Sequence, residues 1–187
     1  QYNIATDARL STNAVKRDFL CAFTQPEISD LKFKSNFKQF VNTWREQYQW
    51  DLFLPLSQND EYNFKTLHLP ITDGQEEFDH LVLSLVKTMI DSLNEKEIVK
   101  QFENPTDLKG GISKLEYWLS ELNFPDYQQQ IKFLRNLQEL RSTGTGHRKG
   151  KGHEKAAGVF GLNTDNYVDV FDRILLQANA FILFLAK

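Results

Sequence analysis

Residues 75–93 read QEEFDHLVLSLVKTMIDSL, and this stretch decides the fold of the chain. Its apolar side chains recur at steps of three and four residues: Phe78, Leu81, Val82, Leu85, Val86, Met89, Ile90 and Leu93. Such spacing places them on one face of a helix. Thr72 and Gln75 can form a capping box in front of it, a typical start of a helix. We therefore predict a helix over about 75–98 that buries one apolar face.

Three later segments have the same helical spacing, and breakers separate them. Asn104-Pro105 and Gly110-Gly111 interrupt the chain, and Pro125 opens a new segment. We predict these helices over about 112–123, 126–142 and 164–186. Four amphipathic helices with short connections favour an antiparallel four-helix bundle over residues 73–187. The predicted fold class is therefore mainly α.

Residues 1–72 differ in character from the bundle segment. A helical face is formed by Phe37, Phe40, Val41, Trp44 and Tyr48. Leu52–Leu54 and Phe64–Leu69 indicate two short strands around a polar turn. We predict a small α+β N-terminal extension over 1–72, with a short β hairpin, packed on the bundle. Its rings at 44, 48 and 50 could stack on bases, but we favour a place in the core.

Composition limits the possible functions. The chain has 187 residues and a net charge of −3, so any contact with nucleic acid must come from a local basic patch. The single cysteine, Cys21, excludes a disulfide within the chain and a cysteine-based zinc site. No apolar run approaches the roughly 18 residues of a membrane span. We predict a cytoplasmic protein without membrane contact. Because the chain begins with Gln1 rather than Met, we expect further domains upstream.

The chain's most concentrated basic patch lies between the third and fourth predicted helices. Residues 141–155 hold five Lys or Arg side chains and one acidic side chain, and six of the nine glycines lie within 144–161. Each glycine inside a helix costs about 1 kcal/mol relative to alanine. We therefore predict a loop over 144–158, the most mobile internal segment. Lysine and glycine loops are often only solvated surface.

Arg141 continues the apolar stripe of the third predicted helix at the next helical step, after Leu134 and Leu137. The pattern predicts that its guanidinium faces the bundle interior or a cleft at its end, where an anionic group must accompany it. The alternative is a cation that stabilises the end of the helix dipole. His147 follows in the glycine-rich stretch and could equally be a surface histidine. His68 and His80 have no clear partners in the sequence.

Two other motifs fail on spacing. A P-loop ending at Gly150-Lys151 needs a glycine where Thr145 stands. His147, His153 and Glu154 could meet a metal ion, but a glycine-rich loop fixes no coordination geometry. We therefore predict no metal ion and no cofactor.

Arg141, five intervening residues and His147 resemble the signature of HEPN domains, an arginine and a histidine at the end of an inner helix of a four-helix bundle. The sequences of 134–142 and 147–150 are also similar to bacterial proteins with HEPN-like C-termini. The resemblance covers about 73–187. It implies metal-independent cleavage of RNA, often by a homodimer, in a toxin or defence role. His147 would be the general acid and base, and Arg141 would hold the scissile phosphate.

Neighbouring residues complete the site that the resemblance implies. Hydroxyl groups and cations that could contact RNA or phosphate are Ser142, Thr143, Thr145, Arg148, Lys149 and Lys151. Many active members of the family have Asn, Asp or His directly after the arginine, where this chain has Ser142. The alternative function is therefore a non-catalytic HEPN-like module of a larger protein that binds a nucleotide or a partner protein.

Overall fold

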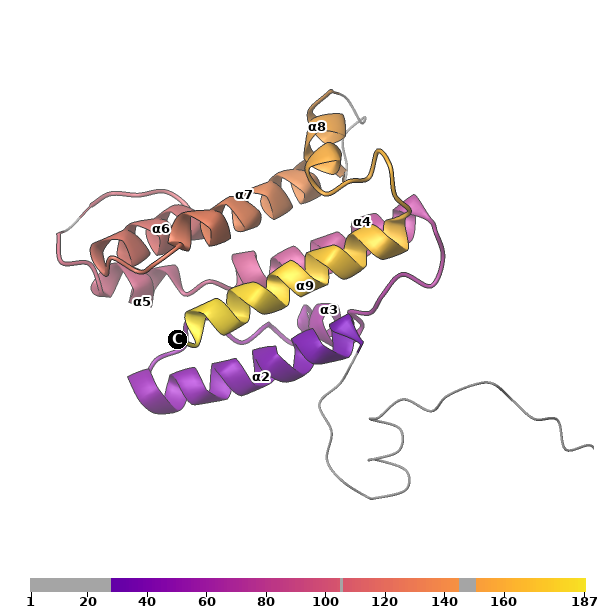
Figure 1. Cartoon of the computed structure of the whole chain (residues 1–187). Helices are drawn as coiled ribbons and strands as arrows, with labels where there is room; N and C mark the ends of the chain where they lie inside the picture. Colours follow the sequence, from indigo (N-terminus) through magenta and orange to yellow (C-terminus); the bar gives the residue numbers. More distant parts are fainter. Residues whose placement is uncertain (1–27, 105, 145–150) are drawn as a thin grey trace, which may run out of the picture.

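The described part of the chain is mainly helical. The computed structural model describes residues 28–104, 106–144 and 151–187, without the side chains of 151–153, and these residues contain no β strand. The helices in chain order are α2 (Ser29–Tyr48), α3 (Glu61–Lys65), α4 (Gln75–Val86), the π-helix η2 (Lys87–Asp91), α5 (Glu95–Lys100), α6 (Gly111–Glu121), α7 (Tyr127–Gly144), α8 (Lys151–Val159) and α9 (Tyr167–Leu185) (Figure 1). Cys21 lies outside the described residues.

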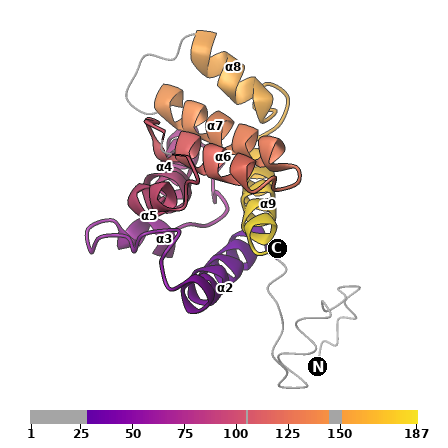
Figure 2. The same ribbon diagram turned by 90° about the vertical axis from the view of Figure 1, so that its left-hand side faces the viewer.

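Helix α9 lies at the centre of the packing, between α2 and α4 (Figures 1 and 2). Helix α7 packs against α4 and α6, and α8 lies across the end of α7. Because α9 contacts neighbouring helices on two sides, residues 174–186 carry no charged side chain. Phe33 of α2 and Leu67 are fully buried in the same hydrophobic core as the later helices, so residues 28–72 share that core. No described helix is both long and apolar enough to cross a membrane.

The helix directions differ from the wholly antiparallel bundle that the sequence predicts. Gly144 at the end of α7 lies beside Asp79 near the start of α4, so these two helices run in opposite directions. Tyr167 at the start of α9 lies against Phe78, with ring centroids 5.1 Å apart, so α4 and α9 run in the same direction. The predicted bundle required short connections between consecutive helices. In the structure, residues 92–110, which include α5, lie between η2 and α6.

The first predicted helix, over 75–98, is divided into α4, η2 and α5. Thr88 Oγ1 donates to the carbonyl of Ser84 at 2.8 Å, and Ser92 Oγ donates to the carbonyl of Thr88 at 2.5 Å. Hydroxyl bonds to the carbonyl four residues earlier bend a helix, which fits the wider π-turn here. Asn94 then caps α5 by accepting the Glu97 N–H at 3.3 Å.

The β hairpin predicted between 52 and 69 is absent from these described residues. Instead, the segment around Phe53 forms one antiparallel bridge with Leu93. Residues 61–65 form helix α3, whose Asn63 is fully buried. Asn63 Nδ2 donates to the carbonyl of Asp60 at 2.9 Å, a local bond that favours a helical turn over a strand.

Helix α8 occupies part of the segment that the sequence predicts to be a loop. Ala156 and Ala157 are buried in the core, and α8 packs on α7. Phe160 directly follows α8, is 6% exposed, and meets Phe133 of α7 edge to face. Burial of a Phe side chain contributes about 1.5–3 kcal/mol. That gain offsets the cost of about 1 kcal/mol for each glycine inside α8.

Candidate functional site

Arg141 stands in the last turn of α7, where the apolar stripe of that helix ends. Its side chain is half-buried and its Nε is shielded from solvent, while Leu137 and Leu140 before it are buried. This placement agrees with the inward orientation predicted from the stripe. The guanidinium is therefore a partly desolvated, permanent positive charge at the end of the helix packing.

Asp79 of α4 supplies an anionic group at the same junction. A methyl group in place of the Gly144 hydrogen would lie 3.1 Å from Asp79 Oδ1. Residues three apart lie on the same side of a helix, so Arg141 and Gly144 both face α4. The pKa of Tyr167 is raised, first by burial and then by the nearby carboxylates of Asp79 and Asp73. Asp73 also accepts the backbone N–H of Tyr167 at 2.7 Å. The junction thus combines one arginine with two carboxylates.

The hydroxyl groups after Arg141 turn back onto their own helix. Ser142 Oγ donates to the carbonyl of Glu139 at 3.0 Å. Thr143 Oγ1 donates to the same carbonyl at 2.8 Å and lies 3.3 Å from that of Leu140. Since each hydroxyl has one proton, neither can donate to a phosphate without first leaving the helix backbone. Their oxygen lone pairs can still accept hydrogen bonds.

The remaining predicted site residues are not placed with Arg141. Thr145, His147, Arg148 and Lys149 lie outside the described residues. Lys151 is the first residue of α8, but its side chain is not described. The structure therefore gathers Arg141, Ser142 and Thr143 on one turn of α7.

His68 and His80, which lack partners in the sequence, line one cavity of about 340 Å³ between α3 and α4. His68 Nδ1 lies 2.7 Å from the carbonyl oxygen of Leu69. A carbonyl oxygen only accepts, so Nδ1 carries the proton of this hydrogen bond. No spacing rule links residues 68 and 80, and only the fold brings them together.

Glu77 lines the same cavity, and its Oε1 lies 3.9 Å from His68 Nδ1. Its carboxylate accepts the Ile71 and Thr72 backbone N–H groups, each at 2.9 Å, and the Thr72 hydroxyl at 2.6 Å. These hydrogen bonds lower the pKa of Glu77 to about 2. These hydrogen bonds occupy the carboxylate, which therefore holds the loop before α4 in place. Within the described ranges, no group of three or more His, Cys, Asp or Glu side chains could hold a metal ion.

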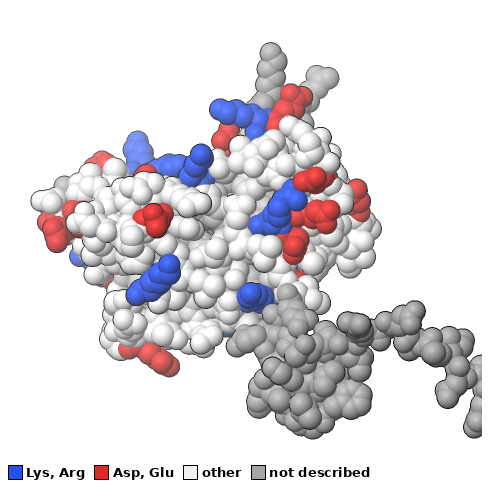
Figure 3. Space-filling model, viewed as in Figure 1, with Lys and Arg blue, Asp and Glu red and all other residues white. Residues whose placement is uncertain are grey.

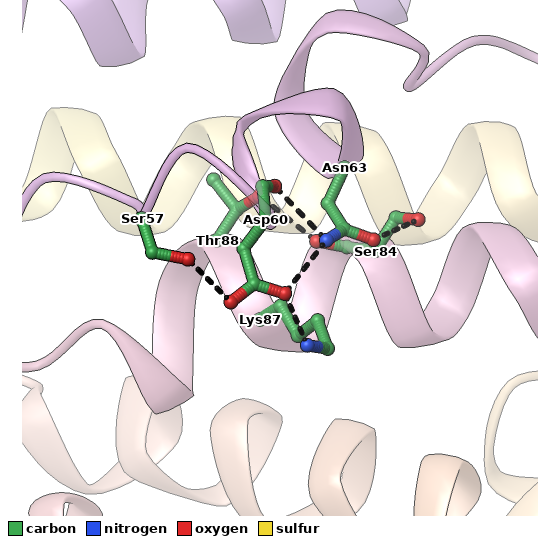
Figure 4. Close-up of polar contacts among 6 residues, drawn as sticks. All are labelled: Ser57, Asp60, Asn63, Ser84, Lys87 and Thr88. Atoms are coloured by element: carbon green, nitrogen blue, oxygen red, sulfur yellow. Dashed lines mark hydrogen bonds and ion pairs between the residues drawn. The ribbon is translucent and has the colours of Figure 1, made fainter.

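A second polar cluster surrounds the start of the π-helix (Figure 4). Lys87 Nζ and Ser57 Oγ bond the two oxygens of Asp60 at 2.6 and 2.9 Å. These bonds, that of Lys87 first, lower the pKa of Asp60. Asn63 Oδ1 accepts the Ser84 hydroxyl at 3.1 Å. Although π-helices are frequent at functional sites, these polar groups bond one another and fasten α3 to α4 and η2.

Charged groups are unevenly distributed on the surface. The face over α9 and α2 is mainly uncharged, with a few lysine and arginine side chains and acidic side chains at its lower edge (Figure 3). Lys and Arg stand beside Asp and Glu near the start of α9 and around α8 (Figure 3). No family model, curated protein or solved structure matches the chain. The functional interpretation therefore depends on these residues.

Proposed function

We propose that residues 73–187 form a HEPN-like domain that cleaves RNA without a metal ion, as a toxin or defence endoribonuclease. Helices α4 with η2, α6, α7 and α9 would be the four helices of the family. The observation that carries the proposal is the position of Arg141: half-buried in the last turn of α7, with Asp79 at the same junction. A surface cation that only stabilised the helix dipole would need neither burial nor a carboxylate.

Arg141 would bind the scissile phosphate and the charge that develops on it. Partial burial strengthens this interaction, because fewer water molecules screen it. Asp79 would hold the guanidinium in place from the α4 side. The chain continues from Gly144 into the basic residues Arg148, Lys149 and Lys151, which would contact neighbouring phosphates.

His147 would move the protons. Two residues, Thr145 and Gly146, separate it from the described end of α7, a chain distance of at most about 11 Å. The 2′-hydroxyl gives its proton to a neutral imidazole and attacks phosphorus, the P–O5′ bond breaks, and an imidazolium protonates the leaving 5′-oxygen. The products are a 2′,3′-cyclic phosphate and a 5′-hydroxyl. One neutral and one protonated imidazole are needed together, which favours a homodimer with two His147 side chains at one cleft.

A specific observation favours a second candidate, the non-catalytic module that binds a nucleotide or a partner protein. Ser142 and Thr143 donate their hydroxyl protons to the backbone of α7. A carboxylate at the junction with Arg141 also suits a structural ion pair. In this case Arg141 would hold α7 on α4, and the basic stretch would bind an anion without cleaving it.

The two candidates differ in product chemistry. Wild-type protein should cleave a mixed-sequence RNA in EDTA, leave 2′,3′-cyclic phosphate ends and spare DNA of the same sequence. Arg141→Ala should lose activity by about 10²–10³-fold, and a thermal melt must show that it stays folded. Binding of RNA without any cyclic phosphate product, at high protein concentration, would favour the module instead.

A further inference from the structure

A cavity of about 230 Å³ lies between α2 and the C-terminal part of α9. Tyr167 begins α9 beside Asp73 of the Arg141 junction, whereas this cavity is lined by residues at the other end of α9. The 19 residues of α9 span about 28 Å. The cavity is therefore separate from the Arg141 junction. We propose that it binds a nucleobase.

Aromatic side chains form one wall of the cavity. Trp44 and Tyr48 stand one turn apart on α2, with ring centroids 4.4 Å apart. Tyr48 is 48% exposed and lines the cavity. Trp44 is held edge to face by Trp50 and Trp118 behind it. A fixed aromatic wall with an accessible ring is the arrangement on which bases stack.

The rim of the cavity carries uncharged hydrogen-bonding groups: Asn36, Gln39, Thr43 and Gln47, at helical spacing along α2. Asn36 Nδ2 donates to Asn179 Oδ1 at 2.7 Å, and Gln47 Nε2 donates to Tyr48 Oη at 3.2 Å. Both bonds leave the amide oxygens of residues 36 and 47 as acceptors. An amide presents a donor and an acceptor side by side, which is the pattern that matches the edge of a base.

Trp44, which lines the cavity, has an unsatisfied hydrogen-bond donor. It is 7% exposed, and its Nε1–H has no hydrogen-bond partner among the described residues. A buried donor without an acceptor is unfavourable. Because Nε1 is shielded from solvent, a ring nitrogen or carbonyl of a base completes this bond only after the indole turns toward the cavity.

Charge and size restrict the ligand further. The lining residues include one charged side chain, Lys187, and the surface around them is mainly uncharged (Figure 3). A free phosphate or an acidic peptide would therefore find few countercharges. An aliphatic side chain of a partner protein would leave the amide rim without hydrogen bonds. The volume is below the roughly 300–1,000 Å³ of cavities for drug-sized ligands, so it suits a single ring system rather than a whole nucleotide.

The test is an NMR titration of the full chain with adenosine and with uridine, up to millimolar concentrations. We expect shifts of the amides of residues 36–48 and 182–187 and of the Trp44 indole N–H. Tyr48→Ala should weaken binding by about fivefold to 100-fold, the value of one stacked base. Tyr62→Ala removes a tyrosine of similar exposure, 47%, that does not line the cavity, and should bind as the wild type does.

Three further outcomes decide the matter. Gln47→Leu should weaken binding while the thermal melt stays unchanged, because Gln47 is exposed. A short single-stranded RNA that shifts the same amides more tightly than the nucleoside identifies RNA as the source of the base, and equal affinity identifies the free nucleoside. No shift with either nucleoside, or shifts that Tyr48→Ala leaves intact, would overturn the proposal. The cleavage assay uses the other end of α9, so the two proposals can fail separately.

Discussion

Replacing Asn63 with alanine tests the polar cluster that fastens α3 to α4. Asn63 is fully buried, donates to the Asp60 carbonyl at 2.9 Å and accepts the Ser84 hydroxyl at 3.1 Å. Ser84 is also fully buried. The substitution therefore removes two hydrogen bonds and leaves the Ser84 hydroxyl without its acceptor.

These losses give the magnitude of the effect. Two hydrogen bonds contribute about 1 kcal/mol each, and a buried hydroxyl left unpaired costs about 1–3 kcal/mol. Asn63→Ala should thus lower the free energy of unfolding by about 3–5 kcal/mol, a large part of the roughly 5–15 kcal/mol typical of a domain. Ser84→Ala should cost less, about 1–3 kcal/mol. In the double variant the unpaired hydroxyl is gone and the bond shared by the two residues is lost only once, so the two effects should fall short of additivity by at least about 2 kcal/mol.

Urea unfolding followed by circular dichroism measures these free energies for the wild type, both single variants and the double variant. Asn42→Ala, an exposed asparagine on α2, is the matched control and should change stability by less than about 0.5 kcal/mol. If the two effects add within about 0.5 kcal/mol, or if Asn63→Ala costs less than about 1 kcal/mol, the cluster does not couple α3 to α4.

Three further predictions concern pH, salt and association. The folded-state pKa of Glu77, about 2, lies below its ordinary value of 4.5, so its stabilising effect is complete above about pH 4.5 and is lost as the pH falls toward 2. Glu77→Gln should flatten acid unfolding monitored by circular dichroism in that range. Lys149→Ala and Lys151→Ala should weaken RNA binding and reduce its salt dependence, by about 0.7 in log–log slope for each phosphate that is no longer neutralised, with little effect on the rate of bound RNA in single-turnover assays. Light scattering should show a homodimer, with an interface above about 1,000 Å² near Arg141, and a monomer at tens of micromolar would count against paired His147 side chains.

The long helices were predictable because their apolar side chains keep strict spacing. Phe78 and Leu85 of α4 are fully buried as that spacing requires, and the inward placement of Arg141 followed from the corresponding stripe of α7. Helix α2 also agrees with its aromatic face, since Phe40 and Trp44 are buried. Side-chain periodicity shows which face of a helix is buried. It is sufficient to predict a helix that packs on its neighbours along its whole length.

Features that depend on contacts distant in sequence were not predictable. Phe53 does form a β bridge, but its partner is Leu93, forty residues further along the chain, so the hairpin prediction chose the wrong partner. Helix α8 is stabilised by the contact of Phe160 with Phe133 in the folded core. The glycine-rich sequence of α8 gives no sign of this contact. Asp79 lies one residue after Phe78 on the edge of a core-facing stripe, and only the position of Gly144 reveals its role at the junction.

The most direct test of the central claim compares wild type, His147→Ala and His153→Ala on a mixed-sequence RNA in EDTA. Both variants lose one histidine from the same basic stretch, and only His147 has the required spacing from Arg141. We predict a loss of about 10²–10⁴-fold for His147→Ala and a rate within a few-fold of wild type for His153→Ala. Equal rates for all three proteins, or no cleavage by any of them at high concentration, would contradict metal-independent cleavage by Arg141 and His147.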